Sequence, residues 1–402
     1  VNFGNQCNGR YTMTDTGEII RRAGYAADSR RSRGRLIAEA EADNRSPFQR
    51  DRDRIIHSSA FRRLKHKTQV FVFHEGDYFR TRLTHSIEVA QIARTIARSL
   101  GGNEDLAEAL ALAHDLGHTP FGHAGEDALS AALGEIGGFD HNVQTLRILT
   151  RLERRYAAFD GLNLTWETLE GIVKHNGPIE APGPAIAAYD AQHPLWLDSH
   201  AGLEAQIAAL SDDIAYNSHD IDDGLRAGLF ALEDVASLPM LGDLLAKIDR
   251  DWPTLERQRR IYELVRELIG VLVRDLTQET RRRLDALAPA TADDIRAAPG
   301  PVASFSPEIW NLLEALRAFL KAHMYRHTQV NRMTSKARRI VTDLFDLFVQ
   351  EPGSLPADWR AHAEGMDSPR RMRVVGDYIA GMTDRYAMLE HQRLFDLYSP
   401  SL

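Results

Sequence analysis

The stretch TRLTHSIEVAQIARTIARSLGGNEDLAEALALAHDLGH, residues 81–118, decides the fold. Its apolar residues recur at the spacing of one buried helix face. The first stripe is Val89, Ile92, Ala93, Ile96, Ala97 and Leu100, and the second is Leu106, Ala109, Leu110 and Ala113. Gly101 and Gly102 separate the two stripes and supply a helix stop. The stretch therefore predicts two consecutive amphipathic helices.

Histidines and carboxylates lie on the inward faces of these helices. His85 precedes Val89 by one turn, and His114 continues the second stripe four residues after Leu110, with Asp115 beside it at the helix end. A third helix is predicted from about Leu203, and it aligns three polar side chains at intervals of four, namely Asp212, Tyr216 and Asp220. Three helices can thus present polar groups to one interior point.

The rest of the chain also has helical periodicity, which predicts an all-α fold. Amphipathic helices are expected at LLAKIDRDW, IYELVRELIGVLVRDL, IWNLLEALRAFLKAHMY and ARRIVTDLFDLFVQ, and loops at 177–194, 286–304 and 351–358. The short VFVF at 70–73 allows at most one small β-hairpin. We expect an N-terminal extension at 1–40, a core at 41–235 that contains these polar groups, and a helical region at 236–402 that packs on this core.

Composition narrows the class of protein. The 402 residues carry a formal net charge of −8, contain one cysteine, and include no apolar run long enough to cross a bilayer. We therefore expect a soluble cytoplasmic protein in which any metal would be held by histidine and carboxylate. The net charge argues against a nucleic-acid coat protein. The locally basic segment at 50–82 either indicates a small polyanionic ligand or is a solvated helix face, and charge alone leaves both open.

The strongest chemical signal is the joint presence of two histidines and two carboxylates. Taken singly, His85 or His114 would more often be a hydrogen-bonded core histidine, and Asp115 a solvated helix-end carboxylate. Taken jointly, buried imidazoles and carboxylates without an ion would be electrostatically expensive. Such ligands suit Mn, Fe, Ni, Zn or Mg and leave room for water, as a metal hydrolase requires.

A second group of proton carriers follows directly in sequence. His118, His123 and Glu126 are expected on a turn interrupted by glycine and proline, where their side chains can project over a metal. Histidine exchanges protons near neutral pH, and a nearby carboxylate can orient it. The alternative is that these residues only cap and form the turn.

Long motifs in this chain resemble those of the deoxyguanosinetriphosphate triphosphohydrolase-like family of the HD-domain superfamily. The resemblance runs from RSPFQRDRDRIIHSSAFRRLKHKTQVF at 45–71 to GDYIAGMTDRYA at 376–387, with HDLGHTPFGHAGE, FDHNVQTLRIL, IVKHNGP and SDDIAYNSHDIDDGL between them. It implies metal-dependent hydrolysis of a deoxynucleoside triphosphate to deoxynucleoside and inorganic triphosphate.

The same resemblance assigns roles to single residues. It implies four metal ligands, which are His85, His114, Asp115 and Asp212. It implies a group beside the scissile phosphate, with His118, Glu126 and His141, and a proton donor for the leaving 5′ oxygen, His123. Contacts to substrate are implied for Gln69 with the 3′ hydroxyl, Arg82 with phosphate, and Tyr216 and Asp220 with the deoxyribose. Asp213 stands where the vertebrate relative has a phosphate-binding lysine, so that contact must come from elsewhere or be absent.

Two alternative functions stay open beside this one. A regulatory module could bind nucleotides on the same scaffold without turnover, and a metal phosphodiesterase or nuclease could use the same metal core on phosphodiesters. The resemblance further implies a homo-oligomer, hexamer or tetramer, and leaves room for a second, activating nucleotide. A membrane partner is not expected, and single-stranded nucleic acid is an open but unpredicted ligand.

Overall fold

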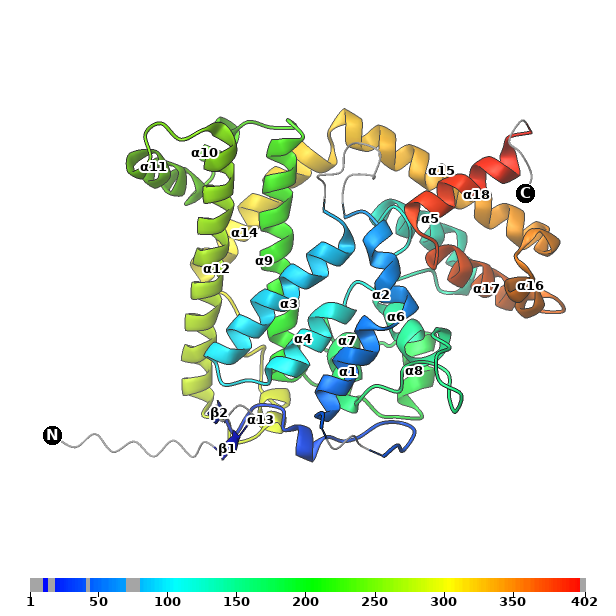
Figure 1. Cartoon of the computed structure of the whole chain (residues 1–402), viewed down its shortest axis with the longest axis horizontal. Helices are drawn as coiled ribbons and strands as arrows, with labels where there is room; N and C mark the ends of the chain where they lie inside the picture. Colours follow the sequence, from blue (N-terminus) through cyan, green and yellow to red (C-terminus); the bar gives the residue numbers. More distant parts are fainter. Residues whose placement is uncertain (1–9, 14–18, 41–43, 70–79, 398–402) are drawn as a thin grey trace.

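The chain is an all-α protein with one small hairpin, as a computed structural model shows (Figure 1). The structure describes residues 10–13, 19–40, 44–69 and 80–397. The helices of its first half are α1 (Pro47–Ile56), α2 (Ser59–Arg63), α3 (Arg82–Ser99), α4 (Glu104–Ala113), α5 (His123–Ala132), α6 (His141–Arg147), α7 (Trp166–Val173), α8 (Pro184–Asp190) and α9 (Leu203–Arg226). Those of its second half are α10 (Leu232–Ala236), α11 (Leu241–Asp251), α12 (Arg257–Leu287), α13 (Ala292–Arg296), α14 (Pro307–Leu320), α15 (Thr328–Gln350), α16 (Ala357–Ala363), α17 (Ser368–Ala380) and α18 (Asp384–Phe395). The predicted fold class is confirmed.

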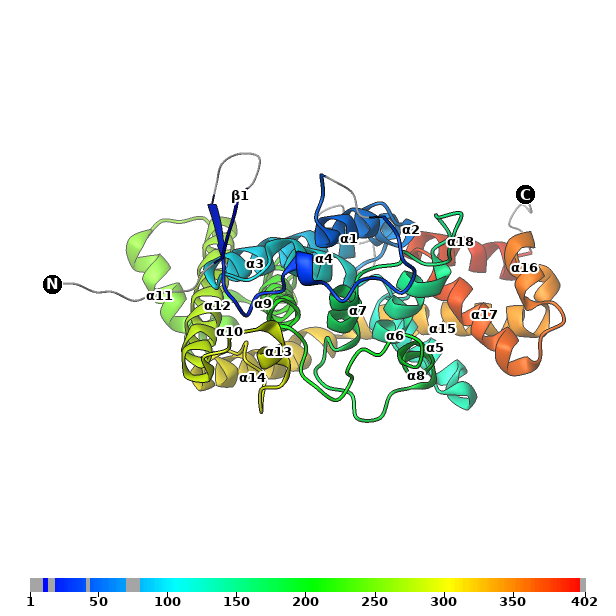
Figure 2. The ribbon, with the colours of Figure 1, turned by 90° about the horizontal axis from the view of Figure 1, so that it is seen from below.

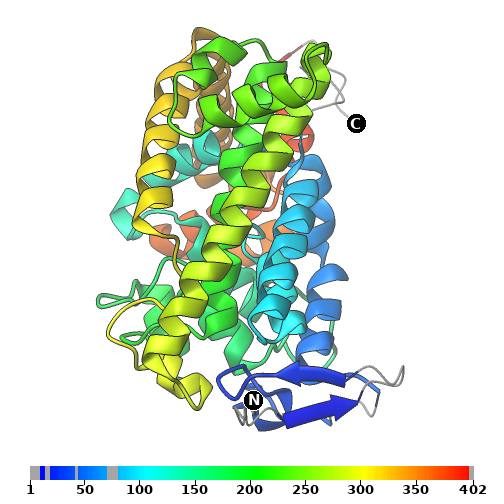
Figure 3. The same ribbon diagram turned by 90° about the vertical axis from the view of Figure 1, so that its left-hand side faces the viewer.

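The hairpin lies near the N-terminus. Strands β1 (Arg10–Met13) and β2 (Ile19–Arg22) pair antiparallel, with Arg10 opposite Arg22 and Met13 opposite Ile19. Directly after β2, the Ala23 amide donates to the Gly101 carbonyl at 2.9 Å, which places the hairpin at the turn between α3 and α4 (Figure 3). No pattern in the sequence predicted these two strands, and the predicted VFVF stretch lies outside the described residues.

Local sequence signals explain the boundaries of α3 and α4. Thr81 caps α3, because its side chain accepts from the Thr84 amide while the Thr84 side chain reaches back. The helix ends at Ser99, and the chain then turns at Gly101, whose φ of +71° favours glycine. Asn103 caps α4 through the Leu106 amide, and His114 forms the other end. Both predicted stripes are buried, so the two amphipathic helices are confirmed.

Three central helices carry most of the predicted site. Helix α3 packs against α4 and α9, and the long α12 lies along the outer side of α9 (Figures 1 and 3). Because α9 begins at Leu203, all three polar residues predicted on its face belong to one continuous helix. The remaining predicted helices appear as α11, α12, α14 and α15. Within the described residues, no helix is both long and apolar enough to cross a membrane.

A second hydrophobic cluster joins α5 to the C-terminal helices. Leu129 of α5 and Leu133 directly after this helix are buried with Val341 and Phe348 of α15 and Ile379 of α17. Figures 1 and 2 show α15, α16, α17 and α18 gathered with α5 at one end of the molecule, away from α11 and α12. The helix after the HTPFGH turn is thus held by residues more than two hundred positions later.

The predicted loops contain short helices. Helix α8 lies within 177–194, α13 lies within 286–304, and α16 begins inside 351–358. The loop prediction was wrong at these positions, because proline was taken as a helix breaker throughout. Pro184 occupies the first turn of α8, where the missing amide proton costs nothing.

Candidate active site

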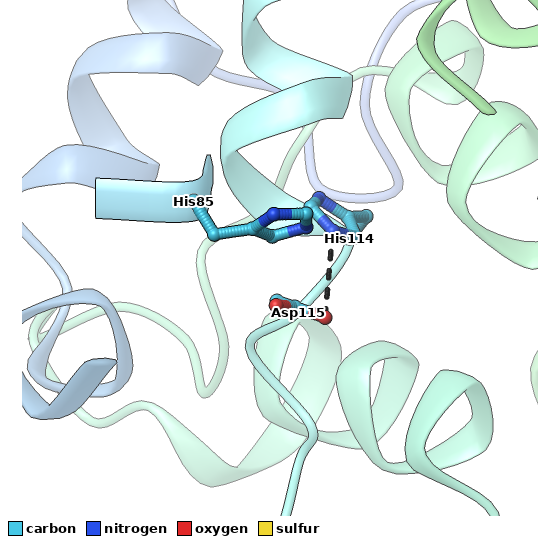
Figure 4. Close-up of side chains that lie close together, drawn as sticks. All are labelled: His85, His114 and Asp115. Atoms are coloured by element: carbon cyan, nitrogen blue, oxygen red, sulfur yellow. Dashed lines mark ion pairs between the residues drawn. The ribbon is translucent and has the colours of Figure 1, made fainter. Parts of the chain in front are cut away.

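The structure brings the four predicted metal ligands together. The ligand atoms of His85, His114 and Asp115 all lie within 4.8 Å of one another, and the three residues are buried (Figure 4). Asp212 approaches from α9, with its Oδ1 at 2.8 Å from His85 Nε2 and 3.5 Å from His114 Nε2. His85 stands in the first turn of α3 and His114 at the end of α4. Their role as ligands stays a prediction.

The state of His114 tests whether these residues fit a cation. Its Nδ1 donates to the Ala111 carbonyl at 2.6 Å, so in the neutral imidazole it is Nε2 that carries the lone pair. That Nε2 is buried without a hydrogen-bond partner among the described residues and lies 3.4 Å from Asp115 Oδ1. Burial lowers the pKa of His114, but Asp115 and Asp212 outweigh this and raise the pKa to about 9. A potential that holds a proton so firmly also attracts a divalent ion, so the residues fit a metal.

A chain of hydrogen bonds behind His85 sets its tautomer. His85 Nδ1 lies 3.3 Å from His219 Nδ1, and His219 Nε2 contacts the carboxylate of Glu88. Glu88 accepts only, so His219 Nε2 carries the proton and its Nδ1 accepts from His85 Nδ1. His85 Nε2 is then left with a lone pair toward Asp212 and the ligand cluster. This arrangement presents the nitrogen that a metal requires.

Removing the end of this chain should weaken metal binding. We expect Glu88→Ala to lower the affinity for Mn²⁺ about 10- to 100-fold, because partners that orient a ligating histidine contribute this much. Calorimetric titration of the metal-free protein measures the affinity directly. Glu135→Ala, at another exposed glutamate, is the matched control and should bind as the unaltered protein does. Equal affinities in the two variants would show that Glu88 does not orient His85.

A second cluster, which we call the proton-transfer group, contains the predicted His118, His123, Glu126 and His141. Glu126 Oε1 lies 2.8 Å from His141 Nδ1, and its Oε2 lies 3.0 Å from His123 Nδ1. The rings of His118 and His141 stack at 4.0 Å. His118 Nε2 lies 3.2 Å from Asp115 Oδ1, which joins this group to the ligand cluster.

The backbone of this group differs from the expectation. His123 and Glu126 belong to the first turn of α5, not to a loop, because Gly122 with φ of +56° reverses the chain and starts the helix. The N-terminal turn of a helix favours a carboxylate such as Glu126. Burial raises the pKa of Glu126, but hydrogen bonds from His123 and His141 outweigh it and hold the pKa well below its usual range.

His118 and His123 of the proton-transfer group differ in burial and access. Burial and the nearby guanidinium of Arg82 lower the pKa of His118 well below its usual value, so this imidazole stays neutral. The side chain of His123 is 67% exposed. A neutral buried imidazole beside an accessible one held by Glu126 provides different partners for proton transfer.

The basic segment at 50–82 is not one polyanion-binding surface. Arg52 pairs with Asp105 and Glu108, and Arg80 pairs with Asp222 and Asp223. Arg54 donates to the Leu162 carbonyl and pairs with Glu39. Most of these arginines therefore hold segments of the fold together. Neither of the two interpretations left open by the sequence describes the whole segment, because most of its charges have partners elsewhere in the chain.

Arg82 and Gln69 do lie beside the ligand cluster. Arg82 is 2% exposed, and its guanidinium donates to Asp115 Oδ2 at 3.0 Å. A Cβ at Gly122 would lie 2.9 Å from that guanidinium and 3.4 Å from the Gln69 carbonyl oxygen, so both residues border the Gly122 turn. The Oε1 of Gln69 is buried without a partner among the described residues, so it can accept from a ligand.

The C-terminal helices hold in place the segment before Gln69 and the turn before His123. Asp384 of α18 accepts from the Thr68 amide at 3.0 Å and from the Phe121 amide at 2.9 Å. The buried Lys67 donates to the carbonyls of His118 and Ala380. Loss of its charge is favoured, since burial lowers the pKa of Lys67 well below its usual range. The segment before Gln69 and the turn before His123 are therefore fixed by one buried network.

A tyrosine pair completes the polar face of α9. The Tyr325 hydroxyl donates to Asp220 Oδ2 and contacts the Tyr216 hydroxyl. The Oδ1 of Asp220 is buried and without a partner among the described residues. Arg317 of α14 pairs with Asp213 at 2.7 Å. This pair brings a cation next to Asp213, the residue that stands in place of the lysine of the vertebrate relative. A cavity of about 470 Å³ is lined by Tyr216, Arg317, Leu320, Lys321, Tyr325 and Arg326.

The buried Asp220 should make stability depend on pH. Burial raises its pKa to about 7 against a smaller lowering by Tyr325, whereas the unfolded value is about 4. A raised pKa stabilises the fold at low pH, and this contribution is lost as the pH rises to about 7. Between about pH 4 and 7, the free energy of unfolding of the unaltered protein should fall by about 1.4 kcal/mol per pH unit more than that of Asp220→Asn, which has no carboxyl group to titrate at this position. Urea denaturation of both proteins across this range tests it; parallel curves would contradict it.

Several site residues were missed by sequence reasoning. His219 lies seven residues after Asp212 and so on the same face of α9, a spacing that could have identified it. His175 stacks on His114 at 5.8 Å with its Nε2 3.8 Å from Asp212 Oδ2, and it stands in the IVKHNGP motif. Tyr325 and Arg317 had no local signal, because they lie in an ordinary amphipathic helix pattern and the turn after it.

Comparison with known proteins places the chain in a family. Residues 82–217 match the HD domain family, and residues 303–393 match the family described as phosphohydrolase-associated domain. A "Deoxyguanosinetriphosphate triphosphohydrolase-like protein" of Parvibaculum lavamentivorans is 58% identical over 385 residues, which cover 94% of this chain and 97% of the relative. The chain belongs to the deoxyguanosinetriphosphate triphosphohydrolase-like family. Proteins with the same name from Bradyrhizobium sp. (57% over 376 residues) and Caulobacter sp. (54% over 390 residues) cover 93% and 96% of the chain, and 96% and 99% of their own lengths.

Membership agrees with the site geometry. The HD domain match covers α3 and α4 and ends inside α9, which are the helices that carry the four predicted ligands. The phosphohydrolase-associated match covers α14 to α18, which supply Arg317, Tyr325 and Asp384. This member of the triphosphohydrolase-like family is therefore an HD-type phosphohydrolase with a His/Asp cluster that could hold a divalent metal.

Proposed function

We propose that this protein hydrolyses a deoxynucleoside triphosphate to a deoxynucleoside and inorganic triphosphate, with a divalent metal ion. One observation carries the proposal most strongly: the 3.2 Å contact between His118 and Asp115 joins a metal-type cluster to a group of imidazoles held by Glu126. Hydrolysis of a phosphoester is helped by a Lewis acid that polarises the phosphate and by a proton donor for the leaving oxygen. The named relatives support a phosphohydrolase, and the geometry supports this substrate.

The cavity beside α9 supports a nucleotide substrate. Arg317, Lys321 and Arg326 line it together with Tyr216 and Tyr325. Arginine and lysine suit the negative charges of a triphosphate, and a tyrosine ring offers a flat surface for a sugar. The unpartnered Oδ1 of Asp220 is an acceptor for a sugar hydroxyl. Arg82, which pairs with Asp115, adds a further cation next to the ligand cluster.

The proposed chemistry breaks the bond between the α-phosphorus and the 5′ oxygen. Water adds to the α-phosphorus, the 5′ oxygen leaves with a proton, and the triphosphate keeps the oxygen from water. A divalent cation held by His85, His114, Asp115 and Asp212 would supply Lewis acidity to the phosphate. His123, which is exposed and held by Glu126, donates the proton to the 5′ oxygen. His118, which stays neutral and stacks on His141, can accept the proton that water loses.

Product analysis tests this proposal against its alternatives. The metal-loaded protein is incubated separately with each of the four deoxynucleoside triphosphates, with a cyclic dinucleotide and with short single-stranded DNA, under several divalent metals. Inorganic triphosphate and deoxynucleoside are expected from at least one triphosphate. Mononucleotide from the cyclic dinucleotide or DNA, with intact triphosphates, would indicate a phosphodiesterase or nuclease. Binding of all substrates without products would indicate a regulatory module.

A further inference from the structure

A second cationic cavity lies away from the ligand cluster. It has a volume of about 500 Å³, which is within the range of small-molecule sites. Arg147 at the end of α6 and Arg151 and Arg154 after it line the cavity, together with Arg370 and Arg373 of α17. Helix α6 begins at His141 of the proton-transfer group, and its seven residues span about 9 Å from first to last Cα. The cavity and the proton-transfer group thus stand at opposite ends of one short helix.

The lining of this cavity has an excess of positive charge. Five arginines face two carboxylates, Asp358 and Asp377, which leaves a net charge of +3 in a chain whose formal net charge is −8. Concentrating cations in a concave surface raises the local concentration of anions.

Some of these arginines are structural and others are available to a ligand. Arg147 pairs with Asp377 through two contacts, and Arg373 donates to the carbonyls of Ile136 and Gly138. In contrast, Arg370 is 77% exposed and lies 3.9 Å from Asp367, a distance and exposure at which an ion pair contributes little. Arg151 is exposed and forms no ion pair within the part of the chain that the structure describes.

The cavity also has an apolar part. Trp359 is half-buried, packs at 5.3 Å from the ring of Tyr378, and lines the cavity with Leu152, Met366 and Val374. An indole held in place by a second ring offers a flat surface for stacking. Guanidinium groups beside such a surface match a molecule that has phosphate at one end and a flat apolar group at the other.

We propose that this cavity binds a phosphorylated small molecule, with Arg151 and Arg370 on phosphate and Trp359 against its apolar part. The proposal does not depend on the reaction at the ligand cluster, because none of the cavity's lining residues belongs to that cluster or to the proton-transfer group. The concave shape favours a small molecule over a nucleic-acid strand. The structure thereby assigns a second anion site to this chain.

Binding to a catalytically impaired protein tests the proposal. Inorganic triphosphate, dGTP and deoxyguanosine are titrated calorimetrically into the full-length His114→Ala protein, alone and with Arg151→Gln and Arg370→Gln added. We expect Arg151→Gln with Arg370→Gln to weaken binding at one class of phosphate sites by about tenfold or more, because each substitution removes a charge-assisted hydrogen bond. Arg250→Gln with Arg339→Gln, two exposed arginines elsewhere, is the matched control. Circular dichroism and thermal unfolding check the fold of every variant.

The probes separate the sources of binding. If Arg151→Gln with Arg370→Gln lowers the affinity for inorganic triphosphate and for dGTP equally, the site recognises phosphate. If Trp359→Leu lowers the affinity for dGTP further, the indole also stacks on the apolar part of the ligand. Deoxyguanosine should not bind at this site. The proposal fails if the control pair weakens binding equally, or if Arg151→Gln with Arg370→Gln leaves phosphate binding unchanged. It also fails if that variant changes only the oligomeric mass or only DNA binding, which would make the cavity a subunit or nucleic-acid contact.

Discussion

His114→Ala is expected to remove both bound divalent metal and turnover. The Nε2 of His114 is buried and lacks a hydrogen-bond partner among the described residues. It lies near the carboxylates of both Asp115 and Asp212. Without this imidazole, the negative charges of Asp115 and Asp212 lose a nearby group that offsets them. Turnover should fall by at least about 1,000-fold, because a catalytic metal contributes several kcal/mol of charge stabilisation. Metal content by mass spectrometry and triphosphate release from dNTP are the two measurements.

A matched histidine separates this effect from a general loss of imidazole. His57→Ala removes an exposed side chain at the end of α1 and should keep metal content and rate. Asp115→Asn should behave as His114→Ala does while preserving side-chain volume next to Arg82. If His114→Ala retained full metal content and full rate, the cluster would be a structural histidine pair and the proposed metal site would be wrong.

His123→Ala is expected to keep metal and lose rate. Its side chain is exposed and contacts Glu126, not the predicted ligands, so metal content should match that of the unaltered protein. The turnover number for dNTP should fall by about 100-fold or more, because a positioned general acid contributes this much. Single-turnover measurement of triphosphate release reports the chemical step.

The nature of the leaving group sharpens this test. An aryl triphosphate that releases p-nitrophenolate needs little protonation of its leaving oxygen, so His123→Ala should slow its hydrolysis far less than that of dNTP. A loss of equal size for both substrates would mean that His123 positions the phosphate and is not the acid. His57→Ala again serves as the control, with unchanged rates on both.

The helices of the site were predictable because their signals are local. Apolar stripes at 89–100 and 106–113 specify which side of each helix is buried, and His85 and His114 follow from register alone. The predicted alignment of Asp212, Tyr216 and Asp220 on one helix is present in the structure, because α9 is continuous through all three residues. The short helices α8 and α13 were missed, because proline and alanine clusters give the same local pattern in a loop and in a brief helix.

Pairings between distant segments were not predictable from local patterns. His85 meets His219 across 134 positions, Asp213 meets Arg317 across 104, and Thr68 meets Asp384 across 316. The basic segment illustrates the same difficulty, because its arginines looked available in sequence and are mostly paired in the structure. Periodicity tells which face is buried but not which residue lies opposite it.

The sequence by itself determined that the protein is helical and which residues gather at one interior point. It did so because a helix repeats every 3.6 residues, so that burial and side-chain direction are readable from spacing. Only the tertiary structure decided which tautomer His85 presents, which arginine accompanies Asp213, and where a second set of arginines forms a cavity. These features depend on contacts between segments far apart in the chain, and no local rule encodes such contacts.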